Sequence, residues 1–163
     1  MTLAGPIEQS FSEAGFVFSP ALIGGHAARI GRASRFRLVR FMATRLHVFV
    51  VIVELSEPAS RAELDALEHA SLEHAIAHKG GLPRGLQTGS AVLTVALVPQ
   101  ADAALREWAG STRFRFATIA YPVLVHASSG VVDRPSRMRL GRIYRSYLSG
   151  LAAEHVTAVA ARG

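Results

Sequence analysis

The sequence predicts an α/β fold in which one mixed sheet is built around a central β-α-β unit. Two almost wholly apolar runs, at residues 48–53 and 91–98, flank a helical segment at residues 60–79. Neither run alternates apolar with polar side chains, so both faces of each strand need cover, as in the interior strands of an α/β layer. An α+β arrangement of the same elements is the alternative.

The helical segment carries a signal at each end. Ser60 and Glu63 have the spacing of a capping box, in which the two side chains satisfy backbone amides at the start of a helix. Gly80 and Gly81, with Pro83 beyond them, form an order that is typical of a helix end. We therefore expect one helix between the two apolar strands.

The remaining elements are expected in a simple order. A strand at residues 36–41 would form a hairpin with the first apolar strand, at residues 46–55. The expected elements after the second apolar strand are a short helix at residues 101–109, strands at residues 114–125 and 131–132, and a C-terminal helix at residues 140–161. Pro122 cannot donate to a strand ladder, so its strand should bend, bulge or lie at a sheet edge there.

The chain is long enough for one hydrophobic core. We expect residues 1–34 to form an irregular or short-helical N-terminal segment, with a short helix at residues 21–30, and residues 35–163 to form a single α/β domain. The order of the elements resembles that of the profilin-like or roadblock/longin-like layer, which is the alternative fold. This is a likeness of topology alone, and it implies neither a function nor a site residue.

The composition excludes several kinds of chemistry. The sequence contains no cysteine, which rules out a disulfide framework, thiolate metal sites and cysteine nucleophiles. Its apolar runs are far shorter than the roughly 20 residues needed to span a bilayer, and its first residues lack the pattern of a secretory signal. We therefore expect a cytoplasmic protein that has no membrane contact.

The formal net charge of +6 is distributed unevenly. Residues 46–83 carry six acids against two basic residues, whereas the segments on both sides have an excess of arginine. This pattern favours an acidic helix that docks onto a basic surface of a second copy or of a partner. The acidic residues expected to meet arginines of another surface are Glu63, Asp65, Glu68 and Glu73.

Arginines cluster before and within the expected C-terminal helix. They are Arg134, Arg137, Arg139, Arg142 and Arg145, with Ser136, Tyr144 and Tyr147 between them. The planar guanidinium group can hold phosphate or carboxylate through two hydrogen bonds, so this cluster could bind a polyanion with salt-dependent affinity. The alternatives are a solvated helix face and contacts with an acidic protein. No known nucleic-acid motif surrounds the cluster.

The helix between the apolar strands carries a pair of histidines. His74 and His78 share one helix face and could ligate a metal ion through their ring nitrogens. The His-Glu-x-x-His order is missing because Glu73 precedes His74, and a third ligand would have to come from a strand end. The candidates are His47, His126 and Glu54. We expect histidines at the core edge, favoured by the helix C-terminus, and no metal or other cofactor.

Three other patterns do not name a reaction. The glycine-rich segment at residues 79–90 follows a helix and enters a strand, which reverses the strand–loop–helix order of a phosphate loop. Glu54 and Glu57 end the first apolar strand, but no lysine on a neighbouring strand completes a nuclease-like group. No Gly-x-Ser-x-Gly elbow follows a strand, which argues against a serine hydrolase.

These observations favour a non-enzymatic binding or assembly module that self-associates, most simply as a two-fold dimer. Both faces of the apolar strands need cover, but we expect only two long helices, at residues 60–79 and 140–161. Part of the sheet or helix surface would then be free to contact a second copy. The first alternative is a protein that binds nucleic acid or another polyanion through the arginine cluster. The second is a small metal-dependent hydrolase that uses His74 and His78.

Overall fold

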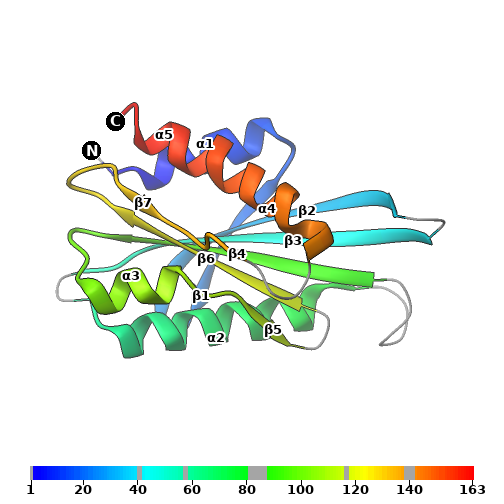
Figure 1. Cartoon of the computed structure of the whole chain (residues 1–163), viewed down its shortest axis with the longest axis horizontal. Helices are drawn as coiled ribbons and strands as arrows, with labels where there is room; N and C mark the ends of the chain where they lie inside the picture. Colours follow the sequence, from blue (N-terminus) through cyan, green and yellow to red (C-terminus); the bar gives the residue numbers. More distant parts are fainter. Residues whose placement is uncertain (1, 40–41, 57–58, 81–87, 116–117, 138–141) are drawn as a thin grey trace.

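The computed structural model describes residues 2–39, 42–56, 59–80, 88–115, 118–137 and 142–163, of which residues 36–39, 42–44, 88, 142 and 143 are described by their backbone alone. These residues form three layers, in which one mixed sheet lies between two layers of helices (Figure 1). The predicted α/β class is thereby confirmed.

The sheet contains seven strands in the described part of the chain. They are β1 (Val17–Ile23), β2 (His26–Val39), β3 (Met42–Glu54), β4 (Thr88–Val98), β5 (Arg113–Arg115), β6 (Thr118–His126) and β7 (Val132–Asp133). The helices are α1 (Ala4–Glu13), α2 (Arg61–His78), α3 (Ala103–Ala109), α4 (Arg142–Leu151), the π-helix η1 (Ala152–Thr157) and α5 (Ala158–Ala160). The last three follow one another without a break and replace the single helix expected at residues 140–161.

The strand order is β1-β2-β3-β4-β6-β5, and β7 also pairs with β6. β1, β2 and β3 form an antiparallel meander, whereas β3, β4 and β6 run parallel to one another. β5 and β7 are antiparallel to β6. Helix α2 connects the parallel neighbours β3 and β4, so the β-α-β unit predicted from the two apolar runs is present.

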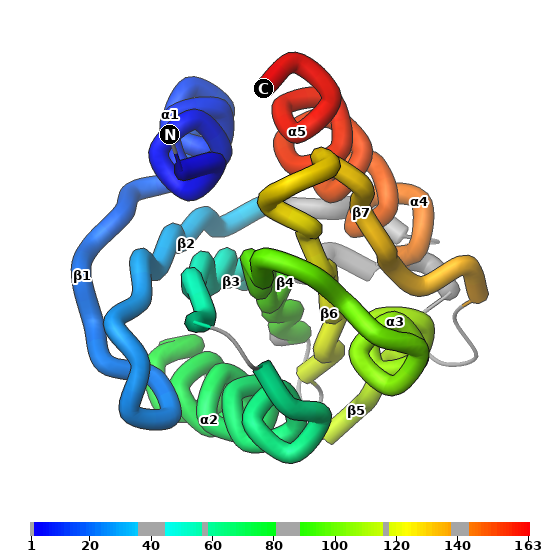
Figure 2. Tube along the Cα trace, turned by 90° about the vertical axis from the view of Figure 1, so that its left-hand side faces the viewer, coloured from blue at the N-terminus to red at the C-terminus, as the bar shows by residue number. Residues whose placement is uncertain are grey.

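The sheet separates two hydrophobic clusters. Along β3, Val48 and Val50 belong to the cluster under α1 and the C-terminal helical segments, whereas Phe49 and Val51 belong to the cluster under α2 and α3. Figure 2 shows these two helical layers above and below the sheet. Because successive strand residues point to opposite faces, a strand covered on both sides must be apolar at every position, which explains the unbroken apolar runs.

Helix α2 begins as the capping box predicts. The Ser60 hydroxyl accepts a hydrogen bond from the Glu63 amide at 3.1 Å, and the Glu63 carboxylate accepts one from the Ser60 amide at 3.4 Å. The helix ends at His78, and Gly80 follows in the left-handed region with a φ of 51°. Both ends of this helix therefore follow from local sequence signals.

The short helix predicted at residues 21–30 was wrong, because these residues form the β1–β2 hairpin. Gly24 and Gly25 have φ values of 57° and 84°, as a two-residue hairpin turn of the primed type requires. Residues 1–34 thus contain α1, β1 and part of β2, and they join the same sheet as the rest of the domain. β2 and β3 do form a hairpin, but residues 36–39 pair with residues 42–45, and residues 46–53 pair with residues 28–35. The predicted pairing of residues 36–41 with residues 46–55 was therefore wrong in its register.

The single strand predicted at residues 114–125 was also wrong, because this stretch contains two antiparallel strands, β5 and β6. On one side, β6 pairs with β4 along its whole length. On its other side, residues 118–120 pair with β5 and residues 124–125 pair with β7. Pro122 therefore lies where β6 has no second neighbour among the described strands, as predicted for a residue without an amide hydrogen.

Three strands, rather than the expected two, precede α2. The element order that suggested the profilin-like or roadblock/longin-like alternative is therefore not the order of this chain. The difference comes from β1, which follows α1 and forms the edge of the sheet. Among the described residues, none of the helices combines the length and the apolar character that a bilayer crossing requires.

Helix α1 covers the sheet face that was expected to need a second copy. Ile7 and Phe11 of α1 are fully buried in the cluster that also contains Leu148 and Val156 of the C-terminal segments. The ring of Phe11 packs edge-on against Phe16, with 5.2 Å between the ring centroids. The chain thus covers both faces of its own sheet, so a second copy is not needed to cover either face.

Candidate anion-binding site

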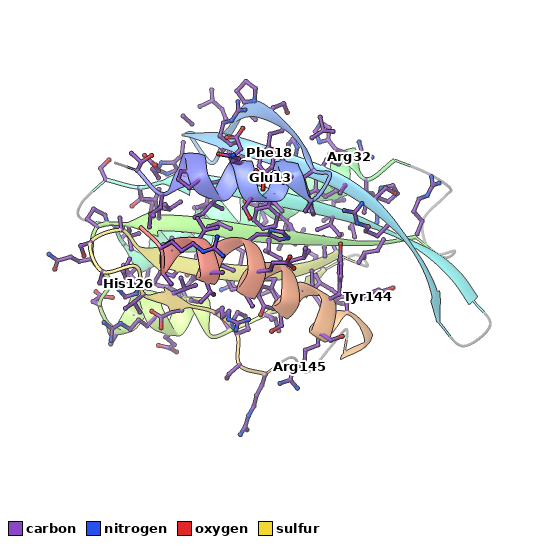
Figure 3. The ribbon with its side chains drawn as sticks, turned by 90° about the horizontal axis from the view of Figure 1, so that it is seen from above. Glu13, Phe18, Arg32, His126, Tyr144 and Arg145 are labelled. Carbon is purple, nitrogen blue, oxygen red and sulfur yellow. The ribbon has the colours of Figure 1, made fainter. Side chains whose placement is uncertain are left out.

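A pocket of about 310 Å³ opens where the segment after β7 passes α4. Its lining residues are Tyr121, Arg134, Pro135, Ser136, Arg145 and Ser149. β6 contributes Tyr121, the segment after β7 contributes residues 134–136, and α4 contributes Arg145 and Ser149. Figure 3 shows Arg145 at the outer edge of the molecule, beside the segment that follows β7. Three parts of the chain thus bring two guanidinium groups and three hydroxyl groups to one cavity.

Tyr121 gives this pocket an unsatisfied polar group. The residue is 1% exposed and its ring belongs to the hydrophobic cluster under α1 and the C-terminal helical segments. Its hydroxyl is buried and forms no hydrogen bond with any described residue. A buried hydroxyl without a partner costs roughly 1–3 kcal/mol, and such groups are rare in folded proteins. An acceptor atom of a ligand in the pocket would satisfy it.

The two arginines of the pocket are held by neutral groups. Arg134 Nη1 donates to the carbonyl oxygen and the hydroxyl of Ser149, both at 2.9 Å. Arg145 Nη2 donates to the carbonyl oxygen of Ser136 at 3.0 Å. Each guanidinium has five N–H donors, so these bonds fix its position and leave donors for a ligand.

Neither arginine is neutralised within the described part of the chain, where no carboxylate lies within 4.0 Å of Arg134 or Arg145. Several other arginines do have acidic partners at that distance, for example Arg29 with Glu8 at 2.6 Å. The pocket therefore holds two positive charges without counter-charges, which is the electrostatic condition for binding an anion.

The structure brings together part of the predicted arginine cluster. Arg134 and Arg145 line the pocket, whereas Arg137 is exposed and does not. Arg139 lies outside the described residues, and Arg142 begins α4 with its side chain undescribed. Sequence reasoning missed Tyr121, although a tyrosine inside an otherwise apolar strand, next to a proline, is a signal that it could have used.

The paired histidines of α2 stack on each other. The ring centroids of His74 and His78 are 4.0 Å apart with an interplanar angle of 20°, and His78 Nδ1 lies 2.8 Å from the His74 carbonyl oxygen. Burial, and then the neighbouring His78, lower the pKa of His74. Within the described residues, no three His, Asp or Glu side chains are grouped so as to hold a metal ion, so His47, His126 and Glu54 do not complete a site.

The acidic residues of α2 find their partners within the same chain. Arg113 of β5 lies 2.9 Å from Asp65 and 3.3 Å from Glu68, and Arg115 lies 2.8 Å from Glu73. Glu63 lies 3.4 Å from the ring of His26. These acids therefore already have partners within the chain, and their contact with arginines of another surface stays a prediction. The fold-back of β5 beside β6, which the sequence did not indicate, places these arginines against α2.

Glu68 is a second polar group that sequence reasoning misplaced. It is 1% exposed, and burial raises the pKa of its carboxyl group to about 7 in spite of the opposing charge of Arg113. A perturbed carboxyl group in a cleft would be a candidate acid or base. Glu68 does not line the cavity beside α1, the pocket beside Tyr121 or the shallow pocket along α4, and its carboxylate lies 3.3 Å from Arg113. We therefore interpret it as a structural group between α2 and β5.

A cavity of about 350 Å³ lies between α1 and the end of the chain. Ser10, which lines it, has its hydroxyl 2.9 Å from Nδ1 of His155 in the π-helix. Ser10 lies within α1, where the backbone amides are engaged in helical hydrogen bonds and supply no oxyanion hole. This pair is therefore a hydrogen bond between two helices rather than a nucleophile and its base.

The structure is thus an α/β domain with a pocket lined by two arginines. Comparison with known proteins found no matching family model, no similar curated protein and no similar solved structure. The chemistry of the pocket therefore rests on its own geometry.

Proposed function

We propose that the protein is a non-enzymatic binding protein that holds a polyanion, with nucleic acid as the partner class, through the Arg134–Arg145 pocket. The observation that carries this proposal is the convergence of two guanidinium groups without counter-charges on a buried, unsatisfied tyrosine hydroxyl. The forked donors of arginine match the oxygen atoms of a phosphate group, which can accept two hydrogen bonds from one guanidinium.

The composition of the pocket favours binding over catalysis. Its lining residues in the described part of the chain include no Asp, Glu or His, and these are the side chains that most often transfer protons at neutral pH. The formal net charge of +6 supports attraction of a polyanion over a longer range. The proposal places the protein in the cytoplasm, because a chain without cysteine needs no oxidising compartment.

Fluorescence anisotropy with a labelled single-stranded oligonucleotide tests this function over a series of salt concentrations. We expect affinity to fall linearly with salt on a double-logarithmic plot, because phosphate contacts release counterions. Arg145→Gln should weaken binding by about tenfold. Arg61→Gln is the control, since Arg61 lies on α2 on the other face of the sheet and Asp65 keeps Arg113 as its partner. Absence of binding at low salt, or equal losses in both variants, would contradict the proposal.

Self-association is a second candidate function, and the edge strand β1 supports it. The outer edge of β1 pairs with no other described strand, and its residues Val17 and Leu22 are each 76% exposed. Exposed apolar edge strands are templates for pairing with another chain, although Pro20 removes one donor from this strand. Light scattering should then show a dimer that Leu22→Lys converts to the 17.4 kDa monomer. A wild-type monomer at high micromolar concentration would exclude this contact.

A further inference from the structure

We infer that the pocket takes a terminal phosphate monoester, so that a nucleic acid is held by a phosphorylated end rather than along its backbone. This inference rests on the proposed function and names the chemical group that the same site selects. Three features of the pocket lead to it: its charge, its closed inner end and its set of donors.

The charge of the pocket matches a dianion. Arg134 and Arg145 together supply two positive charges, and no described carboxylate lies within ion-pair distance of either. A terminal phosphate monoester carries about −1.5 to −2 at neutral pH, whereas each internal phosphodiester of a nucleic acid carries one negative charge. A terminal group therefore neutralises the pocket more fully than a backbone phosphate does.

The inner end of the pocket is closed by the core. Tyr121 lines the pocket yet is 1% exposed, and its ring is part of the hydrophobic cluster under the C-terminal helical segments. A nucleic-acid strand that passed an internal phosphate to this depth would have to enter and leave beside packed apolar side chains. A terminal phosphate is the end of its strand, so the strand has to enter the pocket but does not have to leave it again.

The donors of the pocket match the three free oxygens of a monoester. Arg134 and Arg145 each keep N–H groups beyond those that bind Ser149 and Ser136. The hydroxyl of Tyr121 is buried and unsatisfied, and a phosphate oxygen would accept its proton. The Ser149 hydroxyl accepts a bond from Arg134, so its own hydrogen is available as a further donor.

The test compares one short single-stranded oligonucleotide in its 5′-phosphorylated, 3′-phosphorylated and unphosphorylated forms. At moderate salt, we expect at least one phosphorylated form to bind about tenfold more tightly than the unphosphorylated form, because charge-assisted hydrogen bonds to the terminal group are gained. Inorganic phosphate at millimolar concentration should occupy the pocket and thereby remove the advantage of the phosphorylated form over the unphosphorylated form.

Three variants separate a ligand contact from a structural role. Tyr121→Phe removes the unsatisfied hydroxyl, so the free protein should be as stable as wild type or more stable, while the preference for the phosphorylated end should fall to about a tenth of its value. Arg137→Gln changes the charge by the same amount as Arg145→Gln but at an exposed residue outside the lining. It should leave the preference unchanged, whereas Arg145→Gln should abolish it.

The outcomes distinguish the inference from the function on which it rests. Equal binding of all three oligonucleotides, or a preference that Tyr121→Phe and Arg145→Gln leave intact, overturns the terminal-phosphate inference while polyanion binding stands. Saturable binding of inorganic phosphate without binding of any oligonucleotide supports the phosphate pocket and overturns nucleic acid as the partner, in favour of a small phosphate ester. Absence of binding by all these probes overturns both.

Discussion

Tyr121 and Glu68 are both buried polar side chains, and they differ in what surrounds them. The hydroxyl of Tyr121 lies at a pocket that also contains two guanidinium groups, and it has no hydrogen-bond partner among the described residues. The carboxyl group of Glu68 already has Arg113 at 3.3 Å, but burial favours its neutral form. The first residue therefore points to a ligand, and the second makes the stability of the protein depend on pH.

The buried Glu68 makes the unfolding free energy decrease with rising pH. Its pKa rises from 4.5 to about 7 on folding, so the native state binds this proton more tightly than the unfolded state does. The contribution of Glu68 to the unfolding free energy is therefore highest below pH 4.5 and decreases as the pH rises towards 7 and above. The full decrease is about 3 kcal/mol, since each unit of pKa shift corresponds to roughly 1.4 kcal/mol.

Glu68→Gln should remove this dependence, because glutamine has no proton to lose. Urea unfolding at pH 5 and pH 8 measures it: the variant should be more stable than wild type at pH 8 and should lose less stability between the two pH values. Glu73→Gln is the control, because Glu73 is exposed and pairs with Arg115 at the surface. An unchanged pH slope in Glu68→Gln would show that the buried carboxyl group is not the cause.

At the scale of elements, the turn between β6 and β7 sets the position of the residues that lead to the pocket. Gly130 has a φ of 67°, and a Cβ atom added there would lie 2.6 Å from the carbonyl oxygen of Ala160 in α5. Its amide donates to the carbonyl oxygen of His126 at 2.8 Å. The turn is thus fixed both by its own conformation and by the C-terminal helix above it.

Gly130→Ala should destabilise the protein by about 1–3 kcal/mol, because alanine is strained at this φ and its methyl group meets the α5 backbone. Gly150→Ala is the matched control, since Gly150 lies in α4 and a Cβ atom there would meet nothing within 4 Å. That change should stabilise the helix by up to about 1 kcal/mol. Thermal unfolding compares the two variants, and equal effects of the same sign would contradict this account of the turn.

Elements with local signals could be predicted from the sequence, whereas those that depend on distant contacts could not. The capping residue Ser60 and the glycines after α2 define that helix by themselves, and unbroken apolar runs identify strands covered on two faces. Residues 21–30 were mistaken for a helix because Gly24 and Gly25 were not recognised as a hairpin turn. β5 folds back along β6, and its Arg113 and Arg115 form ion pairs with α2, so this arrangement rests on residues that are far apart in the sequence.

The candidate site could be predicted in part for the same reason. A cluster of arginines is visible in the sequence, and two of its members, Arg134 and Arg145, line the pocket. The packing of β6, the segment after β7 and α4 determines which arginines lie side by side. The same packing brings Tyr121 next to them. That Arg134 and Arg145 have no acidic partner among the described residues is likewise a property of the folded chain, because Asp65, Glu68 and Glu73 of α2 pair with β5 on the opposite face.

At the scale of the whole molecule, charges are arranged differently on the two faces of the sheet. On the α2 face, Arg61, Arg113 and Arg115 each have an acidic partner within 3.3 Å. On the face of the C-terminal helical segments, Arg134 and Arg145 bind neutral groups instead. Arg29, on the same face, pairs with Glu8 of α1, so the difference is specific to the pocket. An anion should therefore be bound where the two arginines and Tyr121 meet.

Titration of the isotope-labelled protein with inorganic phosphate, followed by two-dimensional NMR, tests the anion pocket most directly. The account predicts saturable shifts of the backbone amides of Tyr121, Ser136, Arg145 and Ser149, and their loss in Arg145→Gln but not in Arg137→Gln. A spectrum that does not change, or shifts that grow linearly and spread over exposed arginines on both faces of the sheet, would contradict it.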